Sequence, residues 1–76
     1  MTRYIAFVHK ASIEKAGISL EAIALCGGPL TFCKIMKESG LEEKHYHIYL
    51  QGIKKGRVQE ALERSADYRS IAFSGN

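Results

Sequence analysis

The hydrophobic positions of this chain follow two periodicities, and the period of two appears first. Every residue from 4 to 8 is apolar or aromatic and favours β-structure, which is typical of a strand buried inside a sheet rather than at its edge. Between residues 45 and 51 the even positions are apolar and alternate with a second set of side chains. This alternation predicts a second strand with one face in the core and a polar face opposite. The odd positions of that strand are His45, His47, Tyr49 and Gln51.

A helical periodicity governs the segments between the strands. Apolar residues recur at three- and four-residue spacing in 20–24 and again in 32–36, which predicts two helices. Pro29 fits the first turn of the second helix, and Gly40 fits its C-terminal cap. Residues 57–66 predict a further helix. Its inward-facing positions are expected to be Val58, Ala61, Leu62 and Ser65.

The order of these elements indicates the fold class. A third strand is predicted from Tyr68 to Ser74, with Ile71 and Phe73 facing the core, and residues 11–17 fit either a short helical turn or a loop. The order strand-helix-helix-strand-helix-strand predicts an α+β two-layer sandwich, with helices covering one face of the sheet. We expect a ferredoxin-like fold or a truncated variant of it, because a fourth strand is either missing or supplied by a second copy of the chain.

Length and composition limit the chain to one small globular domain. The 76 residues, taken as a single domain 1–76, are 46% hydrophobic and 25% charged, with one proline. The longest apolar run is far shorter than the roughly 18 to 20 residues that cross a bilayer, and residues 1–10 do not resemble a signal peptide. We therefore expect a cytoplasmic protein without membrane contact. Cys26 and Cys33 are expected to be buried thiols rather than a disulfide.

The histidine pair of the second predicted strand has metal-binding spacing. His45 and His47 would point the same way with Cα atoms roughly 6.5 to 7 Å apart, so both rings could reach one divalent ion such as Mn, Mg or Zn. A third ligand would come from Glu42, Glu43 or His9. The alternative is that these histidines and neighbouring tyrosines form cross-strand pairs that cover an exposed sheet face.

Residues 45–52, HYHIYLQG, resemble the histidine-hydrophobe-histidine motif of the HUH superfamily, which comprises rolling-circle replication initiators and related endonucleases. This resemblance implies a ferredoxin-like sheet whose central strand carries the metal ligands, here His45 and His47. It also implies a catalytic tyrosine downstream that attacks the scissile phosphate. The predicted helix 57–66 contains no tyrosine, so Tyr68 is the residue to which this role would fall. A structural role for Tyr68 at the start of the third strand is the alternative.

A metal-free function follows from the distribution of charge around the same strand. The net charge is +3, and between Lys44 and Gln59 there are four cations and no Asp or Glu. Aromatic and imidazole rings on a sheet can stack on unpaired bases while nearby cations contact phosphates. The chain is therefore predicted to bind single-stranded DNA or RNA. The predicted contact residues are His45, His47, Tyr49, Lys54, Lys55 and Arg57.

A third hypothesis needs neither nucleic acid nor catalysis. A sheet of three strands has exposed edges, and pairing an edge or a face with a second copy would cover them. The chain would then be a homo-oligomeric interaction or regulatory module, most simply a homodimer. The sequence leaves open whether the protein is an enzyme.

Overall fold

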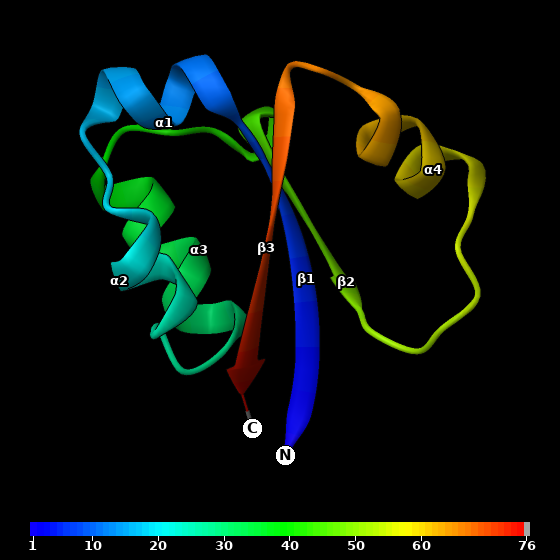
Figure 1. The fold of residues 1–76 in the computed structure, drawn as a ribbon. Coiled ribbons are helices and arrows are strands. Elements are labelled where there is room, and N and C mark those ends of the chain that lie inside the picture. Colours follow the sequence, from blue (N-terminus) through cyan, green and yellow to red (C-terminus); the bar gives the residue numbers. More distant parts are fainter. Residues whose placement is uncertain (76) are drawn as a thin grey trace.

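Three antiparallel strands form the sheet in the computed structural model, which describes residues 1–75 (Figure 1). They are β1 (Thr2–His9), β2 (Tyr46–Leu50) and β3 (Tyr68–Gly75), in the spatial order β2-β1-β3. The central position of β1 explains its sequence, because a strand with neighbours on both sides suits residues that are apolar on both faces. Opposite Phe7 of β1 lie His47 of β2 and Ser70 of β3.

Helices lie on both sides of this sheet. They are α1 (Lys10–Ala16), α2 (Leu20–Ala24), α3 (Pro29–Glu38), the short 3-10 helix η1 (Glu43–His45) and α4 (Arg57–Arg64). Figure 1 shows α1, α2 and α3 together on one side of the sheet and α4 alone on the other. The predicted small α+β fold is confirmed, and its two main layers are the sheet and the helices α1 to α3. Residues 10–16 are helical rather than extended, so the sheet of residues 1–75 has no fourth strand.

The main hydrophobic core lies between the sheet and α1 to α3, and we call this side of the sheet the core face. Its buried strand residues are Ala6, Val8, Tyr46, Ile71 and Phe73. From α3, the Phe32 ring stacks on Phe73 with centroids 5.3 Å apart and meets the Tyr46 ring edge-on at 5.6 Å. Ile71 and Phe73 thus occupy the core as predicted. Such offset and edge-to-face aromatic contacts add to the stabilisation that burial provides.

The opposite side of the sheet, which we call the α4 face, carries a smaller apolar contact. Phe7 is 1% exposed although it points away from the main core. Leu62 of α4 lines a cleft with Ile5 and Phe7, and α4 thereby shields them from solvent. The expectation of helices on only one face was therefore wrong. The physical reason is that β1 is apolar on both faces, and its second face also needs a cover.

Local details of the helices agree in part with the sequence pattern. Pro29 begins α3, and Gly40 adopts a left-handed φ of 81° just after the cap residue Ser39. Helix α4 ends at Arg64, two residues before the predicted end at 66. Its buried residues are Leu62, as predicted, and Gln59. Val58 was expected to point inward but is 61% exposed.

The turn between α2 and α3 lies against the end of β3. A Cβ atom placed on Gly75 would come within 2.5 Å of the Gly28 Cα atom, so the two backbones pack in contact and only glycine fits at position 75 without displacement. This contact closes one end of the free edge of β3. Cys26, next to this turn, and Cys33 are half-buried free thiols. Within residues 1–75 no helix is long and apolar enough to cross a membrane.

Candidate nucleic-acid interface

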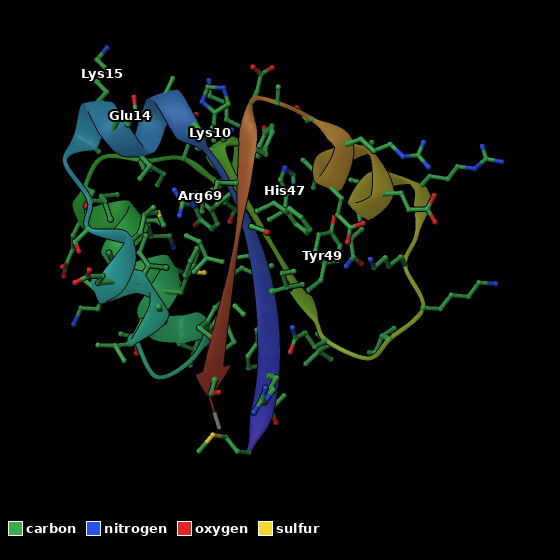
Figure 2. All side chains as sticks on the ribbon, in the orientation of Figure 1. Lys10, Glu14, Lys15, His47, Tyr49 and Arg69 are labelled. Carbon is green, nitrogen blue, oxygen red and sulfur yellow. The ribbon has the colours of Figure 1, made fainter. Side chains whose placement is uncertain are left out.

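Strand β2 places only part of the predicted histidine pair on the α4 face. The strand begins at Tyr46, so His45 belongs to η1 and the strict alternation starts one residue later than predicted. His47 and Tyr49 both project toward the α4 side (Figure 2). Gln51 follows the strand in a turn, where its N–H donates to the Arg3 carbonyl over 3.0 Å. Of the four predicted odd positions, two therefore lie within the strand.

All three histidines of the chain gather near Tyr68, and we call His9, His45, His47 and Tyr68 the histidine–tyrosine cluster. The Tyr68 ring lies 5.4 Å from His9 and 6.0 Å from His47, measured between ring centroids. The rings of His9 and His45 lie 6.4 Å apart. All four residues are half-buried. The antiparallel register, which pairs His9 with Tyr68, brings these distant segments together.

Hydrogen bonds fix two of these imidazoles. His9 Nδ1 accepts from the Ser12 backbone N–H (3.4 Å) and lies 2.8 Å from Ser12 Oγ, so this ring caps α1. His45 Nδ1 accepts from the Glu42 N–H over 3.1 Å and caps η1. His45 Nδ1 also lies 3.2 Å from the Glu42 carbonyl, so in both rings Nδ1 is engaged by neighbouring groups. In both rings Nε2 is therefore the nitrogen that could contact a ligand.

Tyr68 is held at the start of β3 by one further contact. Its hydroxyl donates to the Lys44 carbonyl over 3.4 Å. Tyr68 is the first residue of β3, and this bond ties the start of the strand to the residue before His45. This contact agrees with the structural role that was the alternative to catalysis. The same position keeps the Tyr68 ring beside the His47 ring.

The described residues offer no complete set of metal ligands. Among residues 1–75 no three His, Cys, Asp or Glu side chains are grouped so that they could hold a metal ion. His45 and His47 come from η1 and β2, and the Nδ1 atom of His45 is already bonded to the backbone. A metal at this pair stays a prediction that rests on two ligands.

The predicted cations separate into two groups. Lys55 forms an ion pair with Glu63 of α4, with Nζ and Oε1 2.6 Å apart. Lys54 and Arg57 are exposed and line a groove of about 500 Å³ together with Tyr49. We call this the β2 groove. Its lining residues are Ile48, Tyr49, Leu50, Ile53, Lys54, Gly56, Arg57, Val58 and Gln59. The structure therefore brings Tyr49, Lys54 and Arg57 together in one groove, whereas Lys55 pairs with Glu63 of α4.

Tyr46, between the two histidines, points in the opposite direction from them. It is 7% exposed and packs in the main core. Burial raises the pKa of its hydroxyl above the ordinary value, and the neighbouring Cys33 and Glu43 side chains add to this effect. Tyr46 is therefore part of the core and not of the binding surface.

Comparison with known proteins gives no family for this chain. No protein-family model, no curated protein and no solved structure matches it. The likeness of residues 45–52 to the HUH motif stays a prediction, and the functional argument rests on the residues described above.

Proposed function

We propose that this protein is a small single-stranded nucleic-acid-binding domain. The observation that supports this most directly is the β2 groove, where Tyr49 shares one surface with Lys54 and Arg57. A tyrosine ring stacks on a base regardless of its identity, and adjacent cations neutralise the phosphates on either side. The combination favours binding of unpaired DNA or RNA without strong sequence preference.

The histidine–tyrosine cluster would extend this surface along β2. His47 lies between Tyr49 and Tyr68, since it shares the α4 face with Tyr49 and its ring contacts Tyr68. Five strand residues span about 16 Å at roughly 3.3 Å per residue, so a strand of nucleic acid lying along β2 would meet both ends. The Nε2 atoms of His9 and His45 would contact phosphate or base groups at the far end.

The test is a titration of fluorescently labelled single-stranded DNA and RNA oligonucleotides, followed by fluorescence anisotropy at several salt concentrations. We expect affinity to fall as salt rises, because bound cations release counterions from the phosphates. Lys54→Ala and Arg57→Ala should each reduce the log–log salt slope by about one. Tyr49→Ala should weaken binding by about 1 to 3 kcal/mol, whereas Tyr49→Phe keeps the ring and most of the affinity.

Lys34→Ala provides the matched control, because Lys34 is an exposed lysine on α3, away from the β2 groove. It should leave both the affinity and the salt slope almost unchanged. Absence of salt-dependent binding, or an equal loss in Lys34→Ala and Lys54→Ala, would contradict the proposal.

One observation favours a second candidate, an HUH-type endonuclease. The Tyr68 ring lies beside His47, one of the two residues that match the HUH ligands. In such a reaction the Tyr68 oxygen would form a bond to phosphorus while the sugar oxygen leaves, and a divalent ion would polarise the phosphate. Incubation with labelled single-stranded DNA and manganese should then yield a covalent adduct that Tyr68→Phe abolishes. If binding occurs without an adduct, this candidate fails and the binding function stands.

A further inference from the structure

A small cavity lies between α1, α2 and β3, at the end of the sheet where β1 leads into α1, and we call it the α1 cavity. Its volume is about 90 Å³. It is lined by Val8, Lys10, Ile13, Glu14, Leu20 and Arg69. None of these residues lines the β2 groove or belongs to the histidine–tyrosine cluster. The α1 cavity is therefore separate from the surface that we assign to nucleic acid.

The floor of the α1 cavity is apolar. Val8 and Ile13 are 1% and 4% exposed, and Leu20, the first residue of α2, is half-buried against the main core. One molecule of liquid water takes about 30 Å³, so the cavity has room for roughly three groups of that size. This space suits a branched aliphatic side chain of about three carbons, which would exchange water for an apolar surface.

Charged side chains form the rim of the same cavity. Lys10 and Glu14 come from α1, and Arg69 comes from β3. All three residues are exposed, and Figure 2 shows them on the side of the sheet that carries α1. Arg69 precedes the buried Ile71 by two residues, so the alternation of β3 directs it to the core face. Two cations and one carboxylate thus border one small apolar space.

The charges at the rim do not neutralise one another through ion pairs. Within residues 1–75, none of Lys10, Glu14 and Arg69 takes part in an ion pair. Lys10 and Glu14 are one helical turn apart, but lysine before glutamate is the less favourable order for such a pair. The Arg69 guanidinium and the Glu14 carboxylate can therefore both turn to a ligand in the cavity.

We propose that the α1 cavity binds a free α-amino acid with a short branched aliphatic side chain, such as valine. The guanidinium of Arg69 donates two parallel hydrogen bonds to the ligand carboxylate, and Lys10 supplies a second cation beside it. The ligand ammonium group pairs with the Glu14 carboxylate, and the ligand side chain packs on the apolar floor. An anion or a cation alone would leave one sign of charge at the rim unpaired, whereas an amino acid complements both.

The first test follows the backbone amide resonances of the isotope-labelled full chain during a titration with L-valine, without nucleic acid. We expect a dissociation constant on the order of 1 mM, because a ligand of so few heavy atoms supports little more. The amides that shift should lie in α1, at the start of α2 and around Arg69, while those of the β2 groove stay in place.

Three analogues of valine separate the parts of the recognition. Isovalerate lacks the ammonium group, isobutylamine lacks the carboxylate, and glycine lacks the aliphatic side chain. Each should bind about tenfold more weakly than valine, since each leaves one part of the cavity unmatched. Isovalerate or isobutylamine binding as tightly as valine would overturn the assignment to an amino acid.

Variants at the rim provide the second test. Arg69→Gln should weaken valine binding about tenfold, and Glu14→Gln should weaken it severalfold. The matched controls are Arg64→Gln on α4 and Glu21→Gln on α2, because both residues are exposed and neither lines the cavity. They should bind valine like the parent protein. The amide spectrum of each variant also reports whether it is folded.

Two results would overturn this proposal. One is the absence of shifts at valine concentrations far above the expected dissociation constant, and the other is an equal loss of binding in Arg69→Gln and Arg64→Gln. Neither result bears on the nucleic-acid function, because the assay contains no nucleic acid and the α1 cavity shares no residue with the β2 groove.

Discussion

The two faces of the sheet differ in what covers them. On the core face, α2 and α3 bury Ile23, Phe32 and Met36 completely, and α1 buries Ile13. On the α4 face, a single helix of eight residues buries Leu62 and Gln59. The remaining strand residues on that side are largely polar, aromatic or small, and several are half-buried.

This difference separates the main source of stability from the proposed binding surface within one small sheet. Burial of a large apolar side chain stabilises a fold by roughly 1.5 to 3 kcal/mol, so most of the stabilisation comes from the core face. The α4 face buries fewer large apolar side chains, mainly Phe7 and Leu62, and contributes less. We therefore expect substitutions on the two faces to have separable effects.

The largest effect is expected for Phe32→Ala on the core face. The change removes a fully buried ring that contacts both Phe73 and Tyr46, and such truncations cost about 3 to 5 kcal/mol. A domain of this length has a total stability of about 4 to 11 kcal/mol, so the variant should be largely unfolded or close to it. Urea denaturation followed by circular dichroism measures the loss.

Leu30→Ala is the control for this prediction, because Leu30 lies on the same helix but is 87% exposed. Its effect should stay within about 0.5 kcal/mol. Similar losses in the two variants would mean that α3 does not pack through Phe32.

A smaller effect is expected for Leu62→Ala on the α4 face. The cost should be about 2 kcal/mol, at the low end for a buried leucine, because α4 packs on the sheet through few residues and can relax. Hydrogen exchange should show faster exchange of α4 amides while β1 amides stay protected, since the main core does not depend on α4. Equal acceleration in α4 and β1 would show that the two faces unfold together, and the contrast between them would fail.

The sequence predicted the core face well because that face depends on local periodicity. The strand positions of Ile71 and Phe73, the start of α3 at Pro29 and the class of the fold all follow from spacing and from capping preferences. Each of these features is determined by residues within a few positions of one another.

The α4 face was harder to predict because it depends on contacts between distant segments. Residues 4–8 are apolar on both faces, and this pattern indicates that the second face also needs a covering helix. His45 continues the alternation of β2 in sequence, but η1 turns the chain before the strand starts. The contact of His9 with Tyr68 results from the β1–β3 register, for which the sequence has no local signal.

The smallest effect on stability is expected from the Tyr46 hydroxyl. Tyr46 is the first residue of β2, and its side chain packs in the main core. Burial raises the pKa of its hydroxyl in the folded state above the ordinary value of about 10, with Cys33 and Glu43 adding to the shift. Between the unfolded and the folded pKa, the unfolded chain binds fewer protons at this group than the folded chain does. The contribution of Tyr46 to stability is thus complete below about pH 10 and is lost as the pH rises through the folded pKa.

Tyr46→Phe should therefore have nearly the stability of the parent protein at neutral pH and should lose less stability in alkaline solution. Urea denaturation at neutral pH and at several alkaline values measures both limbs, and the neutral values serve as the control for any change in packing. A parallel alkaline decline in the two proteins would mean that the Tyr46 hydroxyl reaches water in the folded state. The core face at β2 would then be accessible to water, and the contrast between a buried core face and an accessible α4 face would lose its physical basis.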